Sequence, residues 1–129
     1  MAREAFIRDA HYPGRSAIDA YGNGGFRFAD MSHRGSLLCL PSGIHGWNPT
    51  AMPLPAEEDF APVFAEADRI DILLIGTGDR MHFLPPGLKA RFRAAGIVAE
   101  SMSTGAAVRG YNVLLAEERA VSAALVAVD

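Results

Sequence analysis

The sequence predicts an α/β protein with a mixed central sheet, an N-terminal β-meander and a C-terminal β-α-β-α-β succession. Two observations predict this fold. In the first third of the chain, short strand-like segments are separated by glycine-containing turns. In the second half, apolar runs alternate with amphipathic segments, as in largely parallel sheets with helical crossovers. The chain has 129 residues, half of them hydrophobic, so we expect residues 1–129 to form a single domain.

The predicted meander depends on two turns. Gly22-Asn23-Gly24-Gly25 indicates the first turn, because glycine and asparagine tolerate positive φ angles. A second turn is expected around residues 32–35, and Pro41 ends the strand that follows. The strands predicted from this pattern are residues 16–21, 25–30 and 36–40.

The segment from residue 41 to residue 56 contains four prolines and two glycines. This composition predicts an ordered but irregular connection. Trp47 is expected to pin the connection to the body of the domain by burying its ring. Whether the part from Ser42 to Ala56 closes over anything is not determined by the sequence.

The second half predicts helices and strands in alternation. Apolar residues spaced as on one helix face, together with Pro62 in a first turn, predict a short helix that begins near residue 60. A buried strand is expected at residues 71–75, ending at Gly76. The further predicted elements are a helix that opens at Pro85-Pro86 and ends at Gly96, a strand at 97–100, a helix N-capped by Thr104, and a central strand at 121–128.

This order of elements predicts a candidate site. If the strands at 70–75 and 97–100 are parallel neighbours, the loops 76–84 and 101–104 meet at one edge of the sheet, where open α/β sheets bind ligands. Two helix N-termini near this edge favour anions. The tentative ligand-binding residues are Thr77, Arg80, His82 and Thr104. The alternative is structural, because any βαβ unit produces such an edge and Gly76 and Gly78 then only let the chain turn.

Known catalytic and cofactor motifs are incomplete in this sequence. The string from Gly76 begins like a dinucleotide-binding fingerprint, but Met81 stands where the third glycine belongs. There is no P-loop and no nucleophile elbow. Cys39 lies in an apolar run and is expected to be a buried, reduced thiol. We therefore expect no catalytic residues, no metal and no cofactor; the four histidines, which show no metal-ligand spacing, are His11, His33, His45 and His82.

The formal net charge of −3 argues against a nucleic-acid partner, which normally requires a basic surface. Residues 1–9 have no signal-peptide core. The longest nearly apolar stretch, residues 120–128, is about half the length that spans a bilayer, so no direct membrane insertion is expected. These features predict a soluble, cytoplasmic protein.

Asn112 is unusual in the middle of a predicted helix, because its amide competes for backbone hydrogen bonds. Two explanations are open. The first is a buried amide that ties the helix to a neighbouring strand or loop, and the second is a ligand contact.

The strings Gly76-Thr77-Gly78 and Tyr111-Asn112-x-Leu114-x-x-Glu117-x-Arg119, with Glu100, Thr104 and Ala107 between them, resemble the Mth938-like domain family. The first half agrees at Tyr21, Gly24-Gly25-Phe26, Gly35-Ser36-Leu37-Leu38, Pro41 and Trp47. The resemblance covers about residues 15–128. It implies a three-layer α/β fold in which Gly76, Gly78, Tyr111, Asn112, Glu117 and Arg119 form a structural motif. No established catalytic residues come with it.

Two residues depart from the family pattern beside this motif. Gly110 stands where many relatives have threonine, and it is expected to permit close packing. Glu118 stands where many relatives have glycine, so it is strained if that position needs a positive φ angle. Both departures affect any function that depends on the fine geometry of the motif.

Two kinds of function follow. The family is related to mitochondrial complex I assembly factor 3, which implies a non-enzymatic interaction or assembly module with a protein partner, acting on a respiratory or other membrane-associated complex. The alternative is a small anionic-ligand binding protein or enzyme that uses the edge of loops 76–84 and 101–104. A purely structural dimerising domain is a third possibility. The sequence specifies neither the partner nor the oligomeric state.

Overall fold

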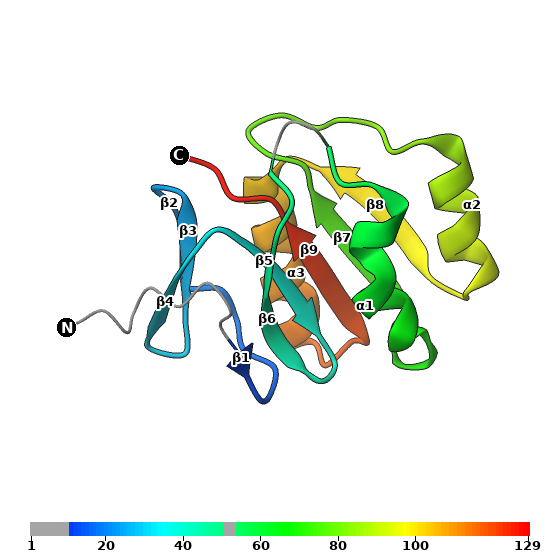
Figure 1. Cartoon of the computed structure of the whole chain (residues 1–129). Coiled ribbons are helices and arrows are strands. Elements are labelled where there is room, and N and C mark those ends of the chain that lie inside the picture. Colours follow the sequence, from blue (N-terminus) through cyan, green and yellow to red (C-terminus); the bar gives the residue numbers. More distant parts are fainter. Residues whose placement is uncertain (1–10, 51–53) are drawn as a thin grey trace.

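The computed structural model describes residues 11–50 and 54–129 (Figure 1). A six-stranded sheet has the order β1-β6-β5-β9-β7-β8. Its strands β1, β6, β5 and β9 are antiparallel neighbours, whereas β9, β7 and β8 are parallel. The bounds of these strands are β1 His11–Tyr12, β5 Ser36–Leu40, β6 Gly43–Trp47, β7 Ile72–Gly76, β8 Val98–Met102 and β9 Val121–Leu125.

The two faces of this sheet carry different layers. Helix α3 (Thr104–Ala116) packs on one face, where its apolar side joins a core that also contains Phe26 and Phe28. The opposite face is covered by η2 (Glu57–Phe60), α1 (Ala61–Ala65), η3 (Ala67–Arg69) and α2 (Pro86–Ala94). Figure 1 shows α1 in front of the sheet and α3 behind it. The predicted three-layer α/β fold with a mixed sheet is confirmed.

The meander is present, but several of its predicted boundaries are wrong; the first strand begins at Ala20 rather than at residue 16, and the second ends at Phe28 rather than at residue 30. A three-stranded sheet is formed by β2 (Ala20–Gly22), β3 (Gly25–Phe28) and β4 (Met31–Arg34). The second turn lies at Ala29 and Asp30, whose φ angles are 49° and 62°, and not at residues 32–35. Because the chain turns earlier than predicted, residues 31–34 form a strand and residues 36–40 belong to the six-stranded sheet.

The prediction of an irregular connection from residue 41 is also wrong in part. Residues 43–47 form β6, which pairs with β5 along its whole length, from Ser36 opposite Trp47 to Leu40 opposite Gly43. Pro41 and Ser42 make the connecting turn. The predicted anchoring by Trp47 is confirmed, because its side chain is 8% exposed and its Nε1 donates to the Asp59 carbonyl oxygen at 2.8 Å. The predicted connection includes residues 51–53, which lie outside the described residues.

The second half follows the prediction closely. The strands β7, β8 and β9 are parallel, and β9 lies centrally between β5 and β7. Pro62 stands in the first turn of α1, and Gly96, with a φ angle of 84°, follows α2. One prediction is corrected: Thr104 is the first helical residue of α3, and the N-cap is Ser103, whose side chain accepts from the Ala106 N–H.

Helix α3 ends in a Schellman motif. The Arg119 N–H donates to the Leu114 carbonyl at 3.0 Å, and the Glu118 N–H donates to the Leu115 carbonyl at 2.9 Å. This geometry gives Glu118 a φ angle of 60°, a conformation that glycine adopts without strain. Glu118 therefore has the left-handed backbone conformation that strains a residue other than glycine.

We expect Glu118→Gly to raise the free energy of unfolding by about 0.5–1 kcal/mol, because relief of the left-handed strain exceeds the added flexibility of the unfolded chain. Urea denaturation measures this change. Glu117→Gly is the control, because Glu117 has a φ angle of −86° and gains no such relief. If both variants destabilise the fold equally, the strain assigned to Glu118 is absent.

Two buried serines provide a contrast in hydrogen bonding. The Ser36 hydroxyl donates to the Pro49 carbonyl at 2.6 Å and accepts from the Ala127 N–H at 2.9 Å. Ser122 is fully buried in β9, and its Oγ has no hydrogen-bond partner among the described residues. A hydroxyl buried without a partner loses its hydration and gains nothing in return.

We therefore expect Ser122→Ala to raise the free energy of unfolding by about 1 kcal/mol and Ser36→Ala to lower it by about 2 kcal/mol. Thermal or urea unfolding of the two single variants tests the contrast directly. A loss of stability in Ser122→Ala would mean that its hydroxyl is bonded in solution.

Candidate functional site

The structure places Thr77 and Thr104 at the predicted edge of the sheet, where Thr104 bonds to Gly78, the residue after Thr77. The Thr104 hydroxyl donates to the Val126 carbonyl at 2.7 Å and accepts from the Gly78 N–H at 3.0 Å. The Thr104 N–H in turn donates to the Gly78 carbonyl at 2.8 Å. Thr104 thus fastens the loop after β7 to the start of α3 and to the segment after β9.

The Thr77 hydroxyl likewise fastens backbone groups, in this case those of its own loop. It lies 2.7 Å from the Arg80 carbonyl, to which it donates, and it accepts from the His82 N–H at 2.9 Å. Both threonines are buried. Their hydroxyl groups are therefore engaged by the protein backbone, and the two residues shape the edge of the sheet.

Gly76 explains how α3 approaches the sheet so closely. A Cβ atom at this position would lie 2.7 Å from the Thr104 Cα and 3.3 Å from the Ala107 Cβ. Gly110 lies further along α3 and also allows a close approach to the sheet. An added Cβ there would lie 3.0 Å from a methyl carbon of Leu74. The close packing expected of Gly110 is thus present, although its neighbour is a flexible side chain.

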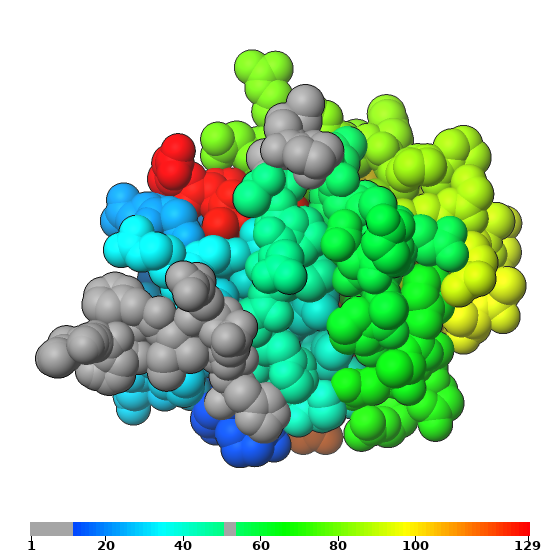
Figure 2. Space-filling model, viewed as in Figure 1, coloured from blue at the N-terminus to red at the C-terminus, as the bar shows by residue number. Residues whose placement is uncertain are grey.

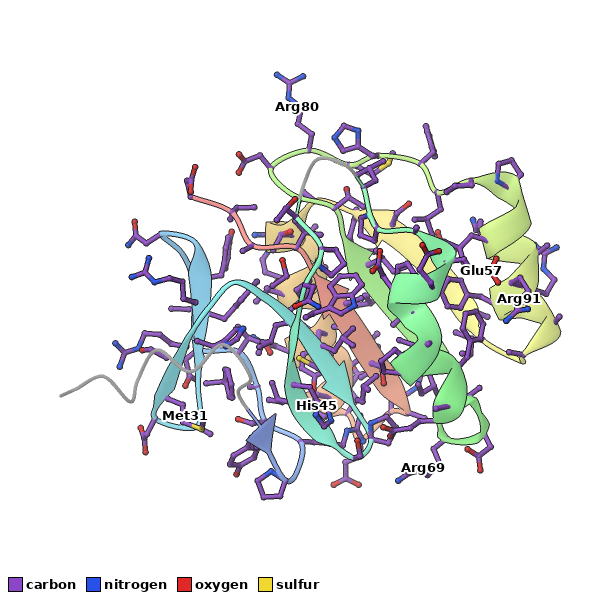
Figure 3. The ribbon with its side chains drawn as sticks, viewed as in Figure 1. Met31, His45, Glu57, Arg69, Arg80 and Arg91 are labelled. Carbon is purple, nitrogen blue, oxygen red and sulfur yellow. The ribbon has the colours of Figure 1, made fainter. Side chains whose placement is uncertain are left out.

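Arg80 and His82 meet Thr77 through their backbone groups. Arg80 is exposed, and Figure 3 shows its side chain directed away from the body of the protein. The bonds to Thr77 come from the backbone groups of Arg80 and His82.

The assignment of Thr77, Arg80, His82 and Thr104 to an anionic ligand stays a prediction. Titration with inorganic phosphate tests it: shifts of the loop amide resonances would support it, and their constancy at millimolar phosphate would refute it.

Asn112 connects α3 to the segment before β2. Its side-chain oxygen accepts from the Ile18 N–H at 2.8 Å, and its side-chain nitrogen donates to the Ile18 carbonyl at 2.9 Å. The carboxamide thus bonds to both backbone groups of the buried Ile18, as the backbone of a neighbouring strand does in a sheet. Of the two explanations open from the sequence, the structure shows the contact that ties the helix to a neighbouring segment.

Three other residues of the family motif lie around the C-terminal half of α3. Tyr111 is buried on the sheet side of the helix. Glu117 is the C-cap residue, and the Arg119 backbone completes the Schellman motif. The Arg119 carbonyl also accepts from the Arg15 guanidinium at 2.8 Å. The Arg119 N–H and carbonyl thus make the contacts with Leu114 and Arg15.

Cys39 lies in the core beside Tyr111. Burial raises the pKa of the Cys39 thiol from 9.0 to about 12, and the hydrogen bond with Tyr111 opposes this shift only in part. Burial also raises the pKa of Tyr111. The free, buried cysteine expected from the sequence is confirmed.

The raised thiol pKa predicts a loss of stability in alkali. Below pH 9 the thiol keeps its proton in both the folded and the unfolded chain. Above pH 9 only the unfolded chain releases it, so stability falls as the pH rises toward 12. At pH 10 we expect the wild type to have lost about 1 kcal/mol more than Cys39→Ala. Parallel stability curves for the two proteins between neutral pH and pH 10 would contradict this.

A groove that the sequence did not predict lies between β6 and the η2–α1 segment. Its volume is about 560 Å³. At one end the Ser42 hydroxyl donates to Glu66 Oε2 at 2.5 Å and lies 3.1 Å from His45 Nε2. Because the single hydroxyl proton points to Glu66, His45 must donate to Ser42. This order differs from a catalytic triad, in which the histidine accepts the serine proton.

Within residues 11–50 and 54–129, no group of three or more histidine, cysteine or acidic side chains is placed to hold a metal ion. No helix in these ranges is long and apolar enough to cross a membrane.

The fold and the contacts around α3 define a three-layer protein of the Mth938-like type. A solution structure from Bordetella pertussis, described as a Mth938-like domain, aligns with a TM-score of 0.66 at 27% identity, over 86% of this chain and 85% of that one. The profile of the family described as "Protein of unknown function (DUF498/DUF598)" matches residues 18–126. The chain belongs to this family.

Two further relatives are informative. A crystal structure described as an outer membrane protein from Bartonella henselae aligns with a TM-score of 0.89 at 58% identity, over 92% of this chain and all of that one. The Bos taurus protein named NADH dehydrogenase (ubiquinone) 1 alpha subcomplex assembly factor 3 is 33% identical over 109 residues, which is 84% of this chain and 59% of the bovine protein. The chain thus spans about three fifths of the length of this relative.

Proposed function

We propose that this chain is a non-enzymatic interaction module that helps to assemble a respiratory complex of the NADH dehydrogenase type. The observation that carries the proposal is the 33% identity with the bovine assembly factor over 84% of this chain. The residues of the family pattern support it, because the side chains of Thr77, Thr104 and Asn112 bond to the protein backbone and hold the fold together. The proposal covers residues 1–129 as a single domain located in the cytoplasm.

Two exposed apolar side chains provide a surface that can contact a protein partner. Phe83 is 81% exposed and Met81 is 43% exposed, both in the loop between β7 and α2. Apolar side chains that protrude together from a folded surface are typical of protein–protein contacts. An assembly module needs such an exposed contact, whereas it needs no reacting group.

Deletion of the gene in its own organism tests this function. We expect the deletion strain to contain less fully assembled NADH dehydrogenase on native gels, with partial complexes in its place, and to recover when the wild-type gene is supplied. NADH oxidation by isolated membranes provides a second readout. Normal amounts of the assembled complex in the deletion strain would contradict the proposed function.

A further inference from the structure

The loop after β7 presents a projection of apolar side chains with one exposed cation, Arg80, next to the exposed Asp79. We call residues 80–83 the projecting loop. It exposes Met81 and Phe83, and Arg80 extends from it into solvent (Figure 3). Figure 2 shows atoms of this yellow-green part of the chain standing out above the surface. The Thr77 hydroxyl bonds to backbone groups at both Arg80 and His82, so the projection is held in a defined shape.

The groove beside β6 has complementary chemistry, and we call it the acidic groove. Trp47 and Pro49 line it from the β6 side, and Pro62 and Ala65 line it from α1. Three carboxylates also line it, whereas no lysine or arginine does so among the described residues. The acidic residues are Glu58, Asp59 and Glu66.

These carboxylates differ in their availability. Glu66 accepts hydrogen bonds from Ser42 and Arg69. Asp59 accepts from the Ala56 N–H at 2.8 Å. Glu58 is exposed, and its side chain makes no hydrogen bond or ion pair within the described part of the chain. Glu58 is therefore the carboxylate best placed to receive a cation from outside.

We propose that two copies of this chain associate by placing the projecting loop of each in the acidic groove of the other. Phe83 then packs against the apolar walls of the groove, and Arg80 pairs with Glu58 of the second copy. The two surfaces match in shape, because one projects and the other is hollow, and in charge at Arg80, which meets the carboxylates of the groove; the exposed Asp79 before it lies outside the projecting loop. This reciprocal exchange closes at two copies. It uses the same Met81 and Phe83 that the proposed function assigns to a protein partner, so the dimer and that partner contact exclude each other, and the association of purified protein tests the dimer alone.

The contact is small, so the dimer is expected to be weak and to form at micromolar to millimolar concentrations of the protein. Sedimentation equilibrium of the purified full chain measures it. The apparent mass of the wild type should rise with concentration from 13.8 kDa toward twice that value. Phe83→Ser and Arg80→Glu should each weaken the association at least tenfold.

Matched controls distinguish this contact from general surface effects. Val113→Ser replaces another exposed apolar residue, 57% exposed, and Arg93→Glu makes the same charge change as Arg80→Glu on α2. Both controls should associate like the wild type. The double variant Arg80→Glu/Glu58→Arg restores the opposite charges across the contact and should recover association. Circular dichroism verifies that each variant is folded.

Three results would overturn the proposal. The first is a wild-type protein that stays monomeric up to millimolar concentration. The second is an association that Phe83→Ser and Arg80→Glu leave unchanged, because another surface must then be responsible. The third is mass that grows beyond two copies, because the exchange is then not reciprocal.

Discussion

Replacing Asn112 with alanine is expected to lower the free energy of unfolding by about 3 kcal/mol. The substitution removes both hydrogen bonds to Ile18 and leaves the N–H and carbonyl of this buried residue without their partner. The contact also joins segments 94 residues apart, so its loss frees the chain before β2 from α3. Urea denaturation followed by circular dichroism measures the change.

Arg109→Ala is the control for Asn112→Ala, because Arg109 lies on the same helix and its side chain is exposed. We expect it to change stability by less than about 0.5 kcal/mol. A similar small change for Asn112→Ala would mean that water replaces the carboxamide without loss, and the structural role assigned to this residue would be wrong.

Replacing Gly76 with alanine is expected to destabilise the fold by about 3 kcal/mol, or to prevent folding. The new Cβ would lie 2.7 Å from the Cα of Thr104, which belongs to the backbone and cannot rotate away. Relief would require α3 to shift from β7, and such a shift would disturb the hydrogen bonds that Thr104 makes to Gly78 and Val126.

Gly87→Ala is the matched control for this substitution. Gly87 lies in the first turn of α2, and an added Cβ there would meet no atom within 4 Å. Because alanine favours helix over glycine, this control should raise stability by about 0.5–1 kcal/mol. If Gly76→Ala proves as stable as the control in thermal unfolding, the close approach of α3 to β7 is not required by the fold.

The parallel half of the fold could be predicted because its signals are local. The apolar run before Gly76 has strand length, and the helical segments after it have the right spacing and end signals. The meander was harder to place. Ala29 and Asp30 carry no strong turn signal, yet they adopt positive φ angles, whereas the composition around residues 32–35 resembles a turn. The strand β6 was missed because its glycines and the nearby prolines resemble a loop.

The site was predictable only in part. The parallel order of β7 and β8 brings the loop after β7, at Gly78, to Thr104 at the start of α3. The hydrogen-bond partners of Thr104 were not predictable, because the Val126 carbonyl reaches Thr104 only through the packing of β9 beside β7. The acidic groove has no sequence signature, since Ser42 and Glu66 are 24 residues apart and meet through tertiary packing.

The most direct test of the proposed assembly role is affinity purification of the tagged full chain from its own cells, after gentle solubilisation, with quantitative mass spectrometry. We expect subunits of NADH dehydrogenase or of its assembly intermediates to be enriched over a tag-only control. Recovery of the intact tagged protein without enrichment of any such subunit would contradict the proposal.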